Sequence, residues 1–152
     1  MIAILPLRKG SKRLRNKNIL KINNQPLYKI ILQKLLKIKS INKIIVTTDY
    51  KLNFKNKKII LHERPRNLRS NCNINRVIKD VINNYNSENY IQLHATSPLL
   101  NRKTIDKAIY CFKKNKKKID TLISVTPLKK RFWRNEKTPL NHNINDAPTT
   151  QN

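Results

Sequence analysis

Short apolar runs alternate with longer amphipathic segments along most of the chain. Five runs of four to six residues are rich in Ile, Val, Leu and Thr, as is typical of strands: Ile2–Pro6, Lys43–Thr48, Lys58–Leu61, Tyr90–His94 and Thr121–Val125. Segments with helical spacing lie between several of these runs. Such alternation predicts an α/β fold with a mostly parallel sheet, because parallel strands need long crossover connections.

Three segments repeat apolar residues at intervals of three and four, which predicts amphipathic helices. The first begins near Pro26, as a proline at the first helical position, and its inward side chains are Leu27, Ile30, Ile31, Leu35 and Ile38. Its lysines are expected to face water: Lys29, Lys34, Lys37 and Lys39. The other two patterns run from Ile74 to Tyr85 and from Ile105 to Phe112.

The first predicted strand continues directly into a loop, residues 8–18, that is dense in cations and small hydrogen-bond donors. Gly10 in this loop is the only glycine of the 152 residues. Glycine suits a tight turn whose backbone N–H groups approach an anion. The G-x-x-x-x-G-K-[ST] pattern of a P-loop is absent. From these residues alone, the segment is either a phosphate-binding loop or a solvated basic loop.

Polar residues also follow two other predicted strands. Asp49 ends the second strand, and Thr96, Ser97 and Pro98 follow the fourth. Open α/β sheets bind ligands at the carboxyl ends of their strands, where the strand order reverses. We therefore expect the loops after these strands to converge on one cleft with residues 8–18.

The composition is strongly basic, with 34 Lys and Arg, 8 Asp and Glu, and a formal net charge of +26. This charge favours polyanions. A second explanation remains open, because Ile, Lys and Asn make up 67 of 152 residues, the bias that A/T-rich codons produce at tolerant surface positions. Lys outnumbers Arg 24 to 10 and aromatic residues are few. Nucleic-acid binding is therefore expected to be nonspecific.

The remaining composition excludes several classes of protein. No apolar run approaches the roughly 18 residues of a membrane span, and a strand pattern stands at the N-terminus, so we expect a cytoplasmic protein without membrane association. Cys72 and Cys111 have no C-x-x-C spacing, which argues against a disulfide framework or a zinc site. Cys111 is expected in the core, on the apolar face of its helix.

Four motifs follow one another along the chain: residues 4–19, 46–49, 64–68 and 93–99. The first reads I-L-P-L-R-K-G-S-K-R-L-R-N-K-N-I, and the others read V-T-T-D, R-P-R-N-L and L-H-A-T-S-P-L. They resemble, in the same order, I-P-A-R-x-G-S-K-R-L-P-x-K-N-I, V-S-T-D, R-P-x-x-L and L-Q-P-T-S-P-L of the CMP-sugar synthetases. Within that family the resemblance is to the acylneuraminate (sialic acid) cytidylyltransferases.

The resemblance implies a three-layer, Rossmann-like nucleotide-diphospho-sugar transferase fold with a mostly parallel sheet, whose C-terminal part is missing here. Residues 1–152 would form a single truncated domain, and residues 127–152, which have no clear period, an irregular arm or tail. The implied function is binding of CTP to activate a 2-keto sugar acid, in the synthesis of CMP-sialic acid or a related CMP-sugar.

The resemblance also implies roles for individual residues. Arg8 and Lys17 would be catalytic, by neutralising charge on the reacting phosphates. The nucleotide-binding set is Arg8, Gly10, Ser11, Lys12, Lys17, Asn18, Arg64 and Asn75. The substrate-binding set is His94, Thr96 and Ser97. His94 and Ala95 depart from the Gln and Pro of the family, and Asn71 replaces an acidic residue, so recognition at these positions is altered.

The resemblance implies Mg²⁺ as cofactor, but Asp49 is the sole carboxylate in the matched motifs. The family's metal-binding aspartates come after the matched region, so no metal ligand is assigned within this chain. The implied partners are CTP and a sugar acid, with a homodimer or a complementing C-terminal partner to complete the site. The alternative is a catalytically silent basic module with the same fold that binds nucleotides or polyanions.

Overall fold

The computed structural model describes residues 1–10, 14–69, 72–128 and 130–143. By their contacts the residues form two units, Met1–Lys116 and Lys117–Asn152. Within the described residues, all the named helices and strands lie in the first unit. Ser11, Lys12 and Asn71 lie outside the described residues.

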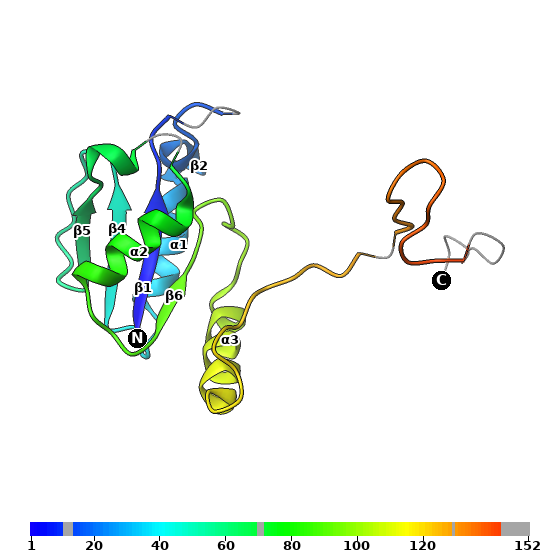
Figure 1. The fold of residues 1–152 in the computed structure, drawn as a ribbon. Helices are drawn as coiled ribbons and strands as arrows, with labels where there is room; N and C mark the ends of the chain where they lie inside the picture. Colours follow the sequence, from blue (N-terminus) through cyan, green and yellow to red (C-terminus); the bar gives the residue numbers. More distant parts are fainter. Residues whose placement is uncertain (11–13, 70–71, 129, 144–152) are drawn as a thin grey trace. The chain divides into compact units, whose positions relative to one another are not determined.

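A four-stranded parallel sheet forms the centre of the first unit (Figure 1). Its order is β5-β4-β1-β6, and the strands are β1 (Ile2–Leu7), β4 (Lys43–Thr48), β5 (Ile59–Glu63) and β6 (Tyr90–Gln92). The chain adds β4 and β5 on one side of β1 and then returns to add β6 on the other side. The strand order therefore reverses beside β1, where α/β sheets place their ligands.

Helices cover both faces of this sheet, as Figure 1 shows for α1 (Leu27–Leu36) and α2 (Ile74–Asn84). Successive strand residues point to opposite faces. The odd-numbered residues of β1 share a core with buried residues of α1 and α3 (Arg102–Asn115): Ala3, Leu5, Leu7, Ile31, Leu35, Ile105 and Ile109. The even-numbered Ile2 and Ile4 instead share a core with Val81 of α2. This three-layer arrangement confirms the predicted α/β fold.

Smaller elements connect the layers. They are the 3-10 helices η1 (Lys17–Ile19) and η2 (Arg66–Leu68), and a hairpin of β2 (Lys21–Ile22) and β3 (Gln25–Pro26). Pro26 is the N-cap of α1 rather than its first helical residue, and it pairs with Lys21. Among the described residues, no helix combines the length and the hydropathy that a membrane crossing requires.

The predicted strand at Thr121–Val125 is wrong. These residues belong to no strand in the described structure, and Ile123 and Val125 are 74% and 79% exposed. The β-branched pattern gives the segment a preference for extended backbone, but a strand forms only with a neighbouring strand to bond. The fourth predicted strand is also shorter than expected, since β6 ends at Gln92.

The predicted core position of Cys111 is wrong as well. Its helix forms as expected, but Cys111 is exposed and the buried residues of α3 are Ile105 and Ile109. A helix that packs along one edge of a core buries only a narrow stripe, and Cys111 lies outside that stripe.

Candidate nucleotide-binding site

Three strands end in one row at the same edge of the sheet. Leu7 of β1 pairs with Thr48 of β4, and Thr48 pairs with Glu63 of β5. The next residue along each strand is Arg8, Asp49 or Arg64. Neighbouring strands lie about 4.8 Å apart, so the register alone places these three charged residues side by side.

Hydrogen bonds join the first two of these strand ends. The backbone N–H of Lys9 donates to Asp49 Oδ1 at 2.6 Å. One row earlier, Thr48 Oγ1 donates to the carbonyl of Leu7 at 2.8 Å and accepts from the backbone N–H of Tyr50 at 3.0 Å. The predicted convergence of the first loop with Asp49 is therefore confirmed.

Arg64 is buried at the third strand end, with 3% of its surface exposed. Its backbone N–H donates to Thr48 O at 3.0 Å, and its Nη2 donates to Thr47 O at 3.3 Å. Its Nε has no hydrogen-bond partner among the described residues. Burial lowers the pKa of Arg64, and the positive charge of Arg8 adds to this, whereas the carboxylate of Asp49 raises it. Arg8, Asp49 and Arg64 therefore form one charged cluster, in which the buried Arg64 Nε has no partner among the described residues.

The first loop folds around a buried asparagine. Asn18 is 6% exposed, and its Nδ2 donates to the carbonyl of Arg8 at 3.0 Å. Gly10 has a φ of +74°, a left-handed conformation that favours glycine. Lys17 begins η1 and is half-buried. Among the described loop residues, the Asn18–Arg8 hydrogen bond thus joins the two ends of the loop.

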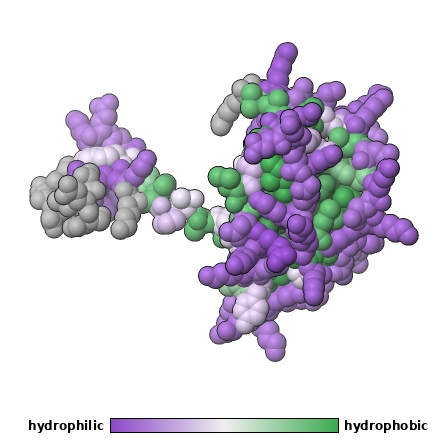
Figure 2. Space-filling view, turned by 180° about the vertical axis from the view of Figure 1, so that it is seen from behind, coloured by the Kyte–Doolittle hydropathy of each residue, from purple (hydrophilic) through white to green (hydrophobic). Residues whose placement is uncertain are grey.

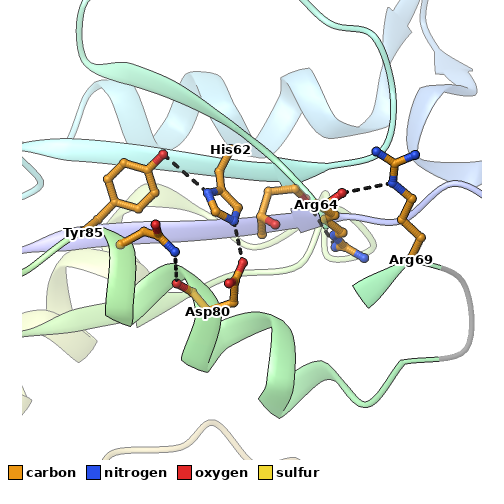
Figure 3. Close-up of polar contacts among 7 residues, drawn as sticks. His62, Arg64, Arg69, Asp80 and Tyr85 are labelled. Carbon is orange, nitrogen blue, oxygen red and sulfur yellow. Dashed lines mark hydrogen bonds and ion pairs between the residues drawn. The ribbon is translucent and has the colours of Figure 1, made fainter. Parts of the chain in front are cut away.

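The segment between β5 and α2 begins with Arg64 (Figure 3), and Asn75 is the second residue of α2. Arg69 spans it, since its Nε donates to Arg64 O at 3.0 Å and its Nη2 donates to Glu63 Oε1 at 2.9 Å. Asn73 caps α2 by accepting from the backbone N–H of Asn75 at 2.9 Å. The side chain of Asn75 is exposed at the first turn of the helix.

The loop after β6 presents the predicted substrate residues. Thr96 and Ser97 are exposed, and the Ser97 N–H donates to His94 O at 3.2 Å. His94 itself is exposed, with its Nε2 3.2 Å from Gln92 Nε2. His94 lies two residues beyond the end of β6, in the loop that follows the strand.

Lys34 of α1 fixes this same loop. Its ammonium donates to the carbonyls of Pro98, at 2.5 Å, and Leu100, at 2.8 Å, and the side chain is half-buried. The expectation that Lys34 faces water is wrong. The helical pattern indicated only that Lys34 lies outside the apolar stripe of α1. It could not show that the loop after β6 brings two carbonyls within reach of the ammonium group.

Two of the predicted site residues, Arg8 and Arg64, form the charged cluster together with Asp49, and Asn18 is bonded to the Arg8 carbonyl. Asn75 lies in the first turn of α2, and Thr96 and Ser97 lie in the loop after β6. Sequence reasoning missed Lys34, Arg69 and the His62–Asp80 contact described below, because none of them stands in a motif.

The carboxylates of the described residues are too dispersed for a metal site of their own. Among these residues, no group of three or more His, Cys, Asp and Glu side chains could hold a metal ion. Asp49 contributes one carboxylate, and its Oδ1 already accepts from Lys9. The protein groups present do not fit a Mg²⁺ ion held by the described residues.

A parallel sheet with helices on both faces, and charged loops at the strand ends beside the reversal of strand order, form a Rossmann-like arrangement, which proteins of many functions share. Residues 2–147 match the cytidylyltransferase family, and the chain belongs to this family. A curated relative, the N-acylneuraminate cytidylyltransferase of Escherichia coli O18:K1:H7, is 47% identical over 49 residues, which cover 32% of this chain and 12% of that protein.

Solved structures of three similar proteins share the fold. A CMP:2-keto-3-deoxy-manno-octonic acid synthetase complexed with CTP aligns with a TM-score of 0.63 and 18% identity, over 76% of this chain and 48% of that one. A cytidylyltransferase from Leptospira borgpetersenii aligns at 0.56 and 23%, over 75% and 48%. The 2-C-methyl-D-erythritol 4-phosphate cytidylyltransferase of Francisella tularensis aligns at 0.63 and 16%, over 93% and 66%. The aligned region thus spans about half the length of the first two structures.

Proposed function

We propose that this chain binds CTP at the carboxyl edge of its sheet and takes part in the activation of a 2-keto sugar acid as its CMP derivative. The observation that carries the proposal is the cluster of Arg8, Asp49 and Arg64 in one row, with the Lys9 N–H bonded to Asp49. The alignment with a synthetase solved with CTP and the 49-residue match to an acylneuraminate enzyme support the substrate class.

The proposed reaction needs little covalent chemistry from the protein. The hydroxyl of the sugar acid attacks the α-phosphorus of CTP, and pyrophosphate leaves. The protein therefore acts by positioning the reactants and by stabilising the developing charge. Arg8 can bridge two phosphate oxygens with its planar guanidinium, while Lys17 acts as a point charge near the leaving pyrophosphate.

The other predicted residues take supporting roles in this proposal. Gly10, Ser11 and Lys12 continue the phosphate loop from Arg8. The buried Nε of Arg64 is a donor for a base or ribose oxygen, and Asn18 and Asn75 border the nucleoside. His94, Thr96 and Ser97, in the loop that Lys34 fixes, face the sugar acid.

Mg²⁺ would shield the phosphates in such a reaction, and we propose that its remaining carboxylate ligands and part of the sugar pocket come from a further segment or a partner chain. Among the matched motifs of this chain, Asp49 is the one carboxylate that could contribute to binding the ion. No step assigned above to the described residues depends on the metal.

The test is calorimetric titration of CTP at fixed ionic strength into the wild-type chain and three variants. Lys17→Ala and Arg8→Ala should each weaken binding by about 1.5–3 kcal/mol, the size of a lost charge-assisted hydrogen bond. Lys37→Ala is the matched control, because Lys37 is exposed at the end of α1 and carries the same charge. Three equal small losses would show a diffuse basic surface, and the nucleotide site would then be withdrawn.

A further inference from the structure

His62 occupies an unusual place for a polar ring. It lies on β5, the edge strand of the sheet, yet only 9% of its surface is exposed. Ile60, two residues earlier on the same face of the strand, packs in the apolar cluster that contains Val81 of α2. An apolar side chain would be expected at position 62, since a buried polar group is costly unless it is hydrogen-bonded.

Both nitrogens of the His62 ring face polar groups of the α2 segment (Figure 3). Its Nε2 lies 2.7 Å from Asp80 Oδ2, and the two side chains are 10% and 24% exposed. Its Nδ1 lies 3.4 Å from the hydroxyl of Tyr85, whose ring also packs edge-on against the imidazole with centroids 5.5 Å apart. The ring is therefore held in one orientation between β5 and α2.

The choice of histidine fits this position. The chain has 34 Lys and Arg and only three His, yet Asp80 faces a histidine. A lysine or arginine, which carries a permanent charge, would lose its hydration at so buried a point, whereas a neutral imidazole can be buried at lower cost. The contact therefore joins strand to helix without placing a permanent cation inside the core.

The contact between His62 and Asp80 joins the two ends of the segment that carries Arg64 and Asn75, the residues proposed to bind the nucleotide. His62 stands two residues before Arg64, and Asp80 stands five residues after Asn75. Between them, Arg64 is bonded to β4 through its backbone and its side chain, and the described residues add local contacts of Arg69 with Arg64 and Glu63 and of Asn73 with Asn75. A shift of α2 along β5 would carry the Asn75 end of this segment away from the Arg64 end.

We propose that His62 and Asp80 are positioning residues for the nucleotide, which fix Arg64 relative to α2 and so set the position of its guanidinium at the proposed site. This inference rests on the proposed function. According to this inference, His62 and Asp80 raise the affinity for CTP by holding Arg64 in place. This effect is separate from any contribution that the pair makes to stability.

The central variant is His62→Leu, which removes both ring nitrogens but keeps an apolar side chain against α2. Loss of one partner destabilises a buried pair, but the Asp80 side chain is 24% exposed and can hydrate its carboxylate, so the variant should stay folded with a lowered thermal midpoint. Its CTP affinity, measured well below that midpoint, should fall by about 3- to 30-fold, within the range of coupling between contacting groups. Asp80→Ala should show a loss of similar size.

The matched control is Asp106→Ala. Asp106 forms an exposed pair with Arg102 on α3, with Nε and Oδ2 3.7 Å apart, so its removal changes the net charge as Asp80→Ala does. The control should keep wild-type affinity. A folded His62→Leu protein that also keeps wild-type affinity would overturn the inference.

A second measurement separates positioning from general loosening of the fold. In an Arg64→Met background, which keeps the aliphatic part of the buried side chain, His62→Leu should cause no further loss of CTP affinity. An equal loss with and without Arg64 contradicts the inference. Wild-type protein that does not bind CTP would overturn the proposed function and this inference with it. Wild-type binding that Lys17→Ala weakens and His62→Leu does not would remove this inference alone.

Discussion

Lys34 illustrates how a single side chain in this protein links two parts of the fold. Its ammonium group reaches from α1 to two carbonyls of the loop after β6, Pro98 and Leu100. Loop carbonyls that turn toward the protein need donors, because they have lost part of their contact with water. A lysine has three N–H donors on a long apolar stem, so it can serve two carbonyls at once.

Replacing Lys34 by Met should therefore lower the free energy of unfolding by about 1.5–3 kcal/mol, the range for hydrogen bonds to a charged group. Methionine keeps most of the apolar stem and removes the donors. Lys29→Met on the same helix is the control, since Lys29 is exposed and should cost little. Urea titration followed by circular dichroism measures both. Equal midpoints for the two variants would argue that the Lys34 contacts add nothing to stability.

At the scale of elements, asparagine occupies several turn and helix-capping positions, including turn positions with left-handed backbone where other proteins often have glycine. Asn16, Asn23 and Asn24 have positive φ values of 54°, 48° and 60°, which asparagine adopts more readily than other non-glycine residues. Asn73 and Asn101 cap α2 and α3. A chain with one glycine and 22 asparagines can therefore still form tight turns and capped helices.

The hairpin of β2 and β3 tests this explanation, because both residues of its turn have positive φ. Asn24→Val should destabilise the protein by about 1–2 kcal/mol, the cost of left-handed backbone for a residue with a Cβ. Asn24→Gly should be close to neutral. Asn53→Val serves as the control, because Asn53 is exposed and is not among the described residues with positive φ. Thermal unfolding of the three variants gives the comparison, and a tolerated valine at position 24 would contradict the explanation.

At the scale of the whole molecule, the net charge of +26 is the dominant property. Hydrophilic side chains cover most of the face seen in Figure 2, with apolar patches between them. Of the ion pairs among the described residues, most involve an exposed carboxylate. Surface pairs of this kind contribute little to stability, so the excess positive charge remains available to solution anions.

Nucleic acid should accordingly bind without sequence preference, and the affinity should fall steeply as salt is raised, because bound counterions are released. Fluorescence anisotropy with two unrelated oligonucleotides of equal length, across 50 to 200 mM salt, would measure this. Excess CTP should displace little of the oligonucleotide if the nucleotide site is separate from the wider surface. Binding that is selective for one sequence and insensitive to salt would favour a dedicated nucleic-acid function.

Much of the fold could be predicted from the sequence because it depends on local pattern. The alternation of Ile2 to Leu7 between two apolar faces, and the spacing from Ile74 to Tyr85, follow from the periods of strand and helix. Sequence could not decide whether Thr121–Val125 forms a strand, since that depends on a partner strand rather than on its own residues. The exposure of Cys111 likewise depended on how narrowly α3 packs.

The sequence by itself determined which chemical groups follow the strands, and its motifs predicted roles for Arg8 and Arg64 in nucleotide binding and a convergence of Asp49 with the first loop. Only the tertiary structure decided the register that places them in a single row, and it alone showed that Arg64 is buried with an unpartnered Nε and that His62 meets Asp80. The physical reason is that covalent order fixes which side chains are near a strand end, whereas contacts between residues 15 or more positions apart are set by how the strands pair and the layers pack.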